Sequence, residues 1–130
     1  MGWTDKRPMS PHLQICKLPI TAKLSILHRG TGAVLTFGLI LLVIALASAA
    51  SGEVAWASIH WLLASWFGHL VLIGFTASLY YHFCNGLRHL FWDAGIGLNL
   101  KSAEKSAIPV LVATVVLTAL TWIIAKLVVV

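Results

Sequence analysis

Charged residues are scarce in this sequence: only 10% of its 130 residues are Asp, Glu, Lys or Arg, against about 25% in a typical soluble protein. Apolar residues make up 59% of the chain instead. A chain of this length cannot bury so much apolar surface in a water-facing core. The composition therefore predicts a single integral membrane domain, residues 1–130, for which the lipid bilayer acts as solvent.

Cysteine is also rare, and the catalytic motifs of soluble enzymes are missing. Cys16 and Cys84 form neither a spaced metal-binding motif nor a disulfide framework. The sequence has no paired carboxylates, phosphate-binding loop or dinucleotide fingerprint. Its net charge of +5 is not carried by a basic tract with interleaved aromatics, which argues against nucleic-acid binding. Any redox role therefore requires an electron source in a partner protein.

Three apolar runs are long enough to cross about 30 Å of hydrocarbon as α-helices. They predict helices at about 22–50, 56–91 and 106–128, preceded by a polar segment at 1–21. Thr21 is predicted to cap the first helix. Backbone polar groups in lipid must be paired within their own segment, so the predicted fold class is an all-α membrane protein with three transmembrane helices.

The distribution of positive charge predicts the orientation of these helices. Eight of the nine Lys and Arg residues lie before the first apolar run or around the second break: Lys6, Arg7, Lys17, Lys23, Arg29, Arg88, Lys101 and Lys105. Such residues favour the cytoplasmic side, so we expect a cytoplasmic N-terminus and an external C-terminus. The N-terminal segment resembles neither a signal peptide nor a transit peptide, which favours a bacterial inner membrane over the mitochondrial inner membrane.

Polar residues gather where the first predicted helix begins and the second ends, at the predicted cytoplasmic face. Ser25, His28 and Arg29 together favour an oxygen-rich or anionic ligand, although a basic helix end without a ligand is an alternative. His82 lies about 10 Å deeper than His89, and an ionisable group at such depth indicates function. A haem ligand, a proton relay and an interhelical hydrogen bond are the alternatives for His82.

A bound haem would explain several neighbours of His82. His82, Gly86, His89 and Asp93 share one helical face, and Gly86 would leave room for a flat macrocycle. Four cationic or imidazole side chains would lie at the level of the haem propionates: His28, Arg29, Arg88 and His89.

The two other histidines of the second predicted helix are not expected to supply a second haem ligand, although ligation by His69 stays an alternative. His60 is expected at the membrane interface, and His69 is expected to hydrogen-bond a neighbouring helix. A bis-imidazole haem needs two axial histidines, and this chain offers only one that is well placed. The second ligand is therefore expected from another subunit.

Three ordered motifs resemble the larger cytochrome b anchor subunits of succinate dehydrogenase, respiratory complex II. They are RPMSPH at 7–12, SILHRGTG at 25–32 and HFCNGLRHLFWD at 82–93. The resemblance implies that a second three-helix anchor subunit completes the helix bundle and shares one haem b. It also implies an FAD flavoprotein and an iron–sulfur subunit on the cytoplasmic side, which pass electrons from succinate to ubiquinone.

The resemblance also implies roles for individual residues. His82 matches the axial ligand of the haem iron. Ser25 and Arg29 match residues of the quinone pocket, where Ser25 can donate a hydrogen bond and Arg29 can stabilise developing negative charge. His28, Arg29 and His89 match positions around the haem propionates.

Asp93 matches an acidic residue near the cytoplasmic end, with a role in organising protons or water. Many relatives carry Tyr where this chain has Cys16, a departure from which we expect no effect on haem or quinone. A fumarate reductase anchor and a cofactor-free membrane scaffold subunit are the alternative functions. The sequence assigns no function to His60, His69 or Cys16.

Overall fold

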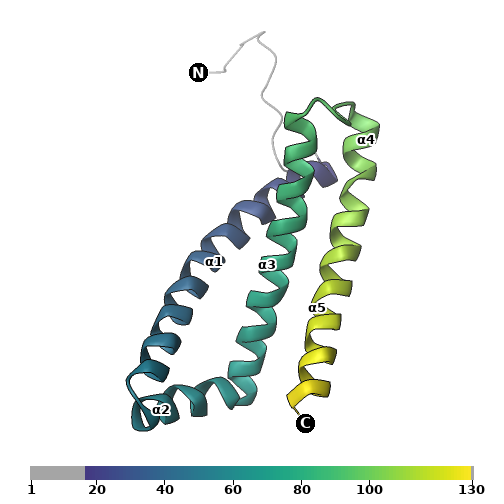
Figure 1. Ribbon diagram of the computed structural model, residues 1–130. Helices are drawn as coiled ribbons and strands as arrows, with labels where there is room; N and C mark the ends of the chain where they lie inside the picture. The colour runs from purple at the N-terminus through teal and green to yellow at the C-terminus, as the bar shows by residue number, and fades with distance from the viewer. Residues whose placement is uncertain (1–16, 130) are drawn as a thin grey trace, which may run out of the picture.

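The computed structural model describes residues 17–129, and long helices account for most of them (Figure 1). In chain order the helices are α1 (Ile20–Ala50), α2 (Glu53–Ala64), α3 (Trp66–Asp93), α4 (Leu100–Lys105) and α5 (Ala107–Val129). α1, α3 and α5 are each long and apolar enough to cross a bilayer. The motif at 7–12 and Cys16 lie outside the described residues.

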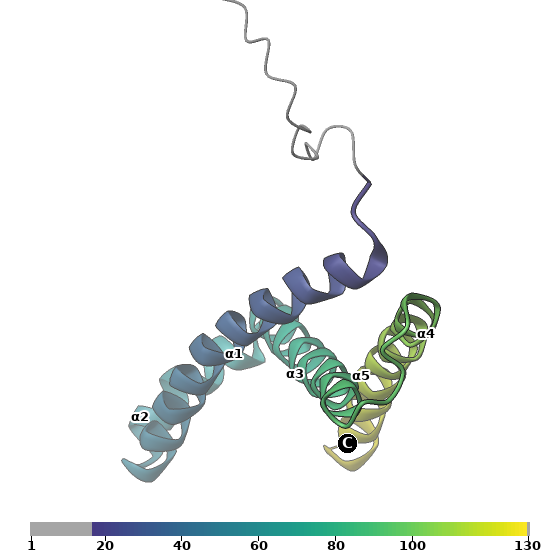
Figure 2. The same cartoon turned by 90° about the horizontal axis from the view of Figure 1, so that it is seen from above.

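α3 is the central helix, because it packs against both α1 and α5 (Figure 1, Figure 2). α1 lies close to α3 near its own N-terminus and leans away from it toward its C-terminus (Figure 1). α2 runs across the end of the molecule and bridges the resulting separation between α1 and α3. The two ends of the molecule are therefore built differently.

The described part of the chain has its buried core at the end where α1 and α5 begin and α3 ends. The core comprises Leu24, Tyr81, Ala107 and Val110, with Ile20 and Cys84 packed against it. The Tyr81 hydroxyl donates a hydrogen bond of 2.7 Å to the backbone carbonyl of Leu24 and so ties α3 to α1. This core fixes the relative position of the three long helices at that end.

Elsewhere the long helices present large apolar side chains outward. Phe37 of α1 is 66% exposed, and Val115 of α5 is 68% exposed. In a bilayer such side chains face lipid tails, which are as apolar as the side chains themselves. The apolar residues of the long helices therefore contribute more to contact with lipid than to an internal core.

The predicted continuous helix at 56–91 is wrong, because the chain turns a corner at Ser65. Ser65 has an extended conformation (φ −65°, ψ 158°) that ends α2 and begins α3. Its hydroxyl donates to the carbonyl of Leu62 at 2.6 Å and accepts from the amide of Gly68 at 3.0 Å. One side chain thus satisfies backbone groups that both helix ends leave free.

Gly68 is the second requirement of this corner. A Cβ atom at this buried position would collide with the backbone carbonyl oxygens of Leu62 and Leu63. The close approach of the end of α2 to the first turn of α3 therefore needs a residue without a side chain.

The start of α1 also differs from the prediction. α1 begins at Ile20 with Pro19 as its extended N-cap residue (φ −62°, ψ 157°), so Thr21 lies in the first turn and does not cap the helix. The Pro19 carbonyl accepts from the amides of Ala22 and Lys23 at 3.1 and 3.2 Å. Proline fits this position because its ring fixes φ near the observed value.

The connection between α3 and α5 contains the short helix α4. Gly95 and Gly97 have positive φ angles of 79° and 75°, which side-chain-bearing residues rarely adopt. The Asn99 side chain then accepts from the amide of Ser102 at 2.8 Å and caps α4. α4 continues directly into α5 along much the same direction (Figure 1), with Ser106 between the two helices.

Candidate functional site: a histidine cluster between α1 and α3

The beginning of α1 and the end of α3 bring three histidines together. The rings of His28 and His82 are stacked, with centroids 3.9 Å apart and planes 10° from parallel. The His89 ring is tilted against His28, with centroids 5.4 Å apart. Residues 28 and 82 are far apart in sequence, and the antiparallel course of α1 and α3 makes them neighbours, as the sequence led us to expect.

The hydrogen bonds of His82 define which of its nitrogens is free. Nδ1 of His82 lies 3.1 Å from the backbone carbonyl of His28 and 3.3 Å from the Thr31 hydroxyl. Because a carbonyl oxygen can only accept, its hydrogen bond requires a proton on Nδ1. A neutral His82 then carries its lone pair on Nε2, the arrangement typical of metal-bound histidines.

Thr31 supports this arrangement and was not singled out by the sequence. It is buried, and its hydroxyl lies 3.0 Å from the Leu27 carbonyl and 2.9 Å from the His28 carbonyl. The available signal was its spacing, since a residue three positions after His28 shares its helical face.

The space around His82 differs between its two sides. An added Cβ at Gly32 would lie 3.1 Å from Cε1 of His82, so α1 approaches the ring closely. An added Cβ at Gly86, one turn further along α3, would meet nothing within 4 Å. The open side along α3 therefore has room for a flat group.

A single free imidazole nitrogen, such as Nε2 of His82, is the kind of donor that a haem iron takes as an axial ligand. Across residues 17–129, no three His, Cys, Asp or Glu side chains are grouped to hold a metal ion. A haem supplies four nitrogen ligands itself and needs only axial ligands from the protein. The buried Nδ1 of His28 has no hydrogen-bond partner among the described residues and adds a second polar group to this site.

The other predicted site residues lie on the same two helix ends. Ser25 is half-buried and Arg29 is exposed on α1, and their spacing of four residues places them on one helical face. Asp93 is exposed and is the last residue of α3. The structure thus brings Ser25 and Arg29 to the histidine end of the molecule and leaves Asp93 beyond it on α3.

Arg88 departs from the expectation that it lies at the haem propionates. It is 5% exposed, and its guanidinium donates to the Ser106 hydroxyl at 2.8 Å, the Ala103 carbonyl at 2.6 Å and Asn85 Oδ1 at 3.3 Å. It also lies 4.1 Å from the ring centre of Trp92. Arg88 therefore ties α3 to α4 and to Ser106, the residue between α4 and α5, because the connection after α3 brings these carbonyl and hydroxyl acceptors to the guanidinium.

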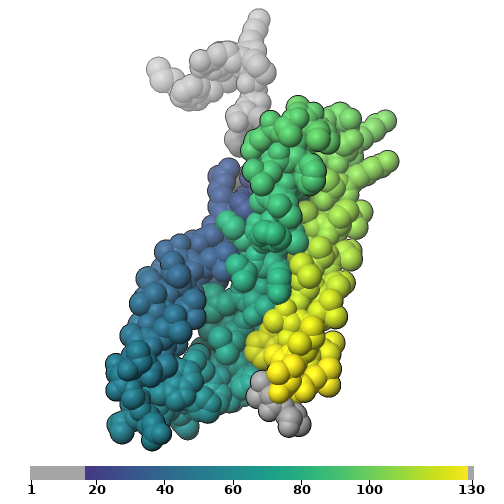
Figure 3. Space-filling view, in the orientation of Figure 1, coloured from purple at the N-terminus to yellow at the C-terminus, as the bar shows by residue number. Residues whose placement is uncertain are grey.

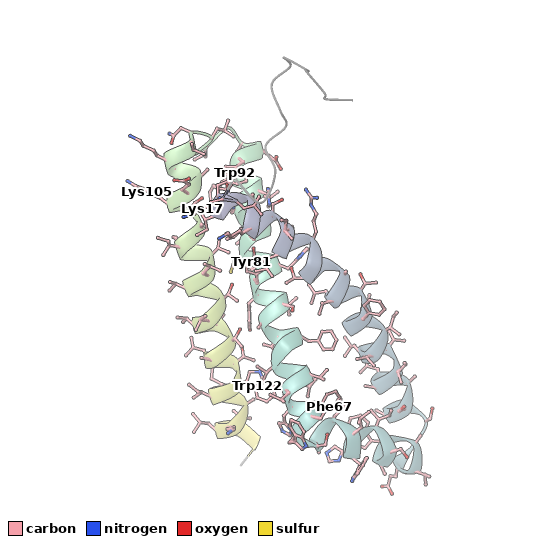
Figure 4. All side chains as sticks on the ribbon, turned by 180° about the vertical axis from the view of Figure 1, so that it is seen from behind. Lys17, Phe67, Tyr81, Trp92, Lys105 and Trp122 are labelled. Carbon is pink, nitrogen blue, oxygen red and sulfur yellow. The ribbon has the colours of Figure 1, made fainter. Side chains whose placement is uncertain are left out.

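Trp92 links this arginine to the histidine cluster. Its ring packs edge-on against His89, with centroids 5.0 Å apart. Trp92 and Tyr81 lie at the same end of the molecule (Figure 4). Packed rings and hydrogen bonds thus run from the start of α5, through α3, to the start of α1.

His60 and His69 lie at the opposite end, away from this cluster. Nδ1 of His69 is 2.9 Å from the carbonyl of Ser65 in its own corner, so the expected hydrogen bond to a neighbouring helix is wrong. Its ring does lie beside Trp122 of α5, with centroids 6.0 Å apart. His60 is exposed and its ring lies 5.7 Å from that of Trp56.

Sequence comparison identifies the family of this chain. Residues 4–121 match the family described as succinate dehydrogenase/fumarate reductase transmembrane subunit. The chain belongs to this family. It is a cytochrome b membrane-anchor subunit of a succinate dehydrogenase complex and a multi-pass membrane protein.

Relatives of the anchor subunit occur in bacteria and mitochondria. The succinate dehydrogenase cytochrome b556 subunit of Paracoccus denitrificans is 43% identical over 118 residues, which cover 91% of each chain. The cytochrome b556 subunit of Rickettsia felis is 37% identical over 92% of this chain and 93% of its own. The mitochondrial cytochrome b560 subunit of Bos taurus is 37% identical over 86% of this chain and 68% of its own.

Proposed function

We propose that the anchor subunit holds a haem b through His82, and that a second anchor subunit supplies the other axial histidine. The supporting observation is the 3.1 Å contact between His82 Nδ1 and the His28 carbonyl, which leaves Nε2 free to bind iron. The open space beside Gly86 and the cytochrome names of the relatives agree with this proposal. A haem bound there would supply one-electron redox chemistry.

In this proposal, the residues around His82 orient the ligand and neutralise charge. The carbonyl of His28 and the Thr31 hydroxyl hold the His82 ring in one tautomer and one orientation. His28, Arg29 and His89 provide positive or hydrogen-bonding groups for the two propionates. Neutralised propionates cost less to place near the low-dielectric interior.

The quinone site is proposed at the same end of the molecule, on Ser25 and Arg29. The Ser25 hydroxyl donates a hydrogen bond to a ubiquinone carbonyl oxygen. Arg29 stabilises the negative charge that develops on the ring during reduction. Asp93, at the end of α3, organises water or protons for the two protons that reduction takes up.

The proposed complex contains a second anchor subunit, an iron–sulfur subunit and an FAD flavoprotein. The last two dock on the side where α1 begins, which we assign to the cytoplasm of a bacterial cell with an inner-membrane location. The exposed basic residues Lys17, Lys101 and Lys105 lie at this end, on α4 and near the start of α1 (Figure 4). Electrons then reach ubiquinone from the iron–sulfur subunit without leaving this face.

The haem assignment is tested by His82→Ala in the purified complex, with His69→Ala as the matched control on the same helix. The dithionite-reduced minus oxidised spectrum should lose or strongly shift its b-type bands in His82→Ala and keep them in His69→Ala. An unchanged spectrum in His82→Ala would reject the ligand assignment. A spectrum without b-type bands in the wild-type complex would favour the cofactor-free scaffold.

The quinone assignment is tested by Ser25→Ala, with Ser48→Ala as its control. Both serines are half-buried on α1, at opposite ends of the helix. Ser25→Ala should lower succinate:ubiquinone reductase activity and leave succinate oxidation by artificial acceptors intact. Equal ubiquinone reduction by the two variants and the wild type would make Ser25 a structural residue.

A further inference from the structure

The corner at Ser65 makes α2 unnecessary for crossing the membrane. α3 contains 28 residues, so it alone is about 42 Å long at 1.5 Å per residue, against about 30 Å of hydrocarbon. α2 adds 12 more residues but runs across the end of the molecule opposite the histidine cluster (Figure 1, Figure 3). It follows one membrane-spanning helix and precedes another, so it lies at the level of the membrane boundary.

The side chains of α2 are divided between a polar and an apolar face. At 100° per residue, Glu53 and His60 lie on one face together with two alanines. Ile59 and Leu62 lie on the opposite side, about 130° and 170° from the centre of that face, and Leu63 lies at the edge of the apolar side, about 90° from it. Ile59 and Leu63 are half-buried, which orients this apolar face toward the bundle and the bilayer.

Two tryptophans border the polar face of α2, one on each side. Trp56 and Trp61 are each about 70° from the centre of that face by the same helical geometry. Trp61 is 76% exposed, and so is Trp66 at the start of α3. Tryptophan favours the headgroup level of a bilayer, where its ring contacts apolar chains and its N–H contacts polar groups.

An apolar groove between α1 and α3 reaches α2 at Leu63. The groove extends from α2 toward the hydrocarbon region. The groove has a volume of about 460 Å³ between α1 and α3 and is lined by residues that include Leu63, Leu42 and Phe75. Because Leu63 belongs to both the groove and α2, the apolar face of α2 is continuous with the lipid-facing surface of the two spans.

We propose that α2 is an interfacial helix that lies in the headgroup layer of the leaflet opposite the His82 site. Its partner is the lipid surface: Glu53 and His60 face water, Trp56 and Trp61 lie among headgroups, and Leu62 contacts the first acyl carbons. The proposal goes beyond the haem and quinone sites and depends only on the membrane-spanning course of α1 and α3. Its function is to fix the depth of α3, and hence of the residues at the other end of α3.

The proposal is tested by site-specific photo-crosslinking in the intact complex. Benzoylphenylalanine is introduced singly at His60, Trp61 or Leu62, and at Leu41 in the exposed middle of α1 as a lipid-facing control. The complexes are placed in nanodiscs of phosphatidylethanolamine and phosphatidylglycerol and irradiated, and adducts are located by mass spectrometry. Each variant is first required to co-purify with its partner subunits.

The expected pattern is a graded one. Leu62 should give adducts on the first acyl carbons, Trp61 on the glycerol and headgroup region, and His60 several-fold less lipid adduct than Leu62. Leu41 should give adducts deep in the acyl chains. Deep acyl adducts at all three positions, His60, Trp61 and Leu62, would place α2 inside the hydrocarbon. Adducts to a partner subunit would make α2 a protein interface. Either result overturns the proposal.

This test is independent of the proposed function. The b-type spectrum of each variant is recorded beside its adducts. Loss of the interfacial pattern with a normal spectrum rejects the role of α2 and leaves the haem assignment intact. The graded pattern in a complex without b-type bands supports the role of α2 and rejects the haem assignment.

Discussion

The two ends of this anchor subunit are stabilised by different means. At the histidine end, Tyr81 bonds α3 to α1, Arg88 bonds α3 to the connection before α5, and a buried core includes the first residues of α5. At the α2 end, α1 is separated from α3, an apolar groove lies between them, and a serine corner joins the helices. Direct contact joins all three long helices at the first end, whereas at the second end α1 is joined to α3 through α2 and the Ser65 corner.

Arg88→Met should produce the largest loss of stability, because Arg88 makes three hydrogen bonds at 5% exposure. Leaving its buried acceptors unpaired should cost about 3 kcal/mol. The thermal stability of the purified complex measures this loss, with Lys126→Met at the other end of the molecule as the control. Equal melting temperatures for the two variants would mean that the two ends do not differ in this way.

Gly32→Ala should cost about 2 kcal/mol and shift the b-type spectrum, because the new Cβ would lie 3.1 Å from the His82 ring. Gly38→Ala on the same helix is the matched comparison variant. There the new Cβ would lie 2.8 Å from Phe75, but that ring borders the groove and can move. A larger spectral shift in Gly38→Ala than in Gly32→Ala would contradict the rigid packing assigned to the histidine end.

Tyr81→Phe and Tyr80→Phe compare two neighbouring hydroxyls on α3. Tyr81 is 4% exposed and donates to the Leu24 carbonyl, whereas the Tyr80 hydroxyl pairs with Thr121 of α5 at 2.7 Å and is only part-buried. Removing a buried partner from a carbonyl should cost about 1.5 kcal/mol, and removing the Tyr80–Thr121 bond about 0.6 kcal/mol. Thermal melts of the two variants should therefore rank Tyr81→Phe as the less stable, and the reverse order would contradict the comparison.

Ser65→Ala should have the smallest effect, about 0.5 kcal/mol, because a helix cap is lost but the corner keeps Gly68. The b-type spectrum at the distant end should stay unchanged. The photo-crosslinking of α2 described above, repeated in Ser65→Ala, tests directly whether the corner is kept. Ser58→Ala, at an exposed position of α2, is the control. A spectral change in Ser65→Ala would show that the two ends are coupled more strongly than the structure indicates.

Hydropathy and charge predicted the helical class of this protein and the meeting of the two polar helix ends. The 56–91 prediction failed because a corner without proline or charge leaves an apolar run apparently continuous. The sequence marks that corner only by Ser65 and Gly68, three residues apart. Arg88 was misplaced for a different reason: two of its acceptors, Ala103 and Ser106, lie in the connection between α3 and α5, and hydropathy does not predict how that polar connection folds. The roles of His82, Ser25 and Arg29 stay predictions that the proposed variants test.

The partners of Arg88 have one more consequence. The acceptors that the structure describes for its guanidinium are two oxygens of neutral side chains and a backbone carbonyl. These bonds hold the charge in place without cancelling it, so this end of the membrane domain keeps a fixed positive potential in surroundings that screen it weakly. In the proposed function, an electron on the haem or quinone at this end is stabilised by that potential, so the same side chain that joins the helices would also favour reduction there.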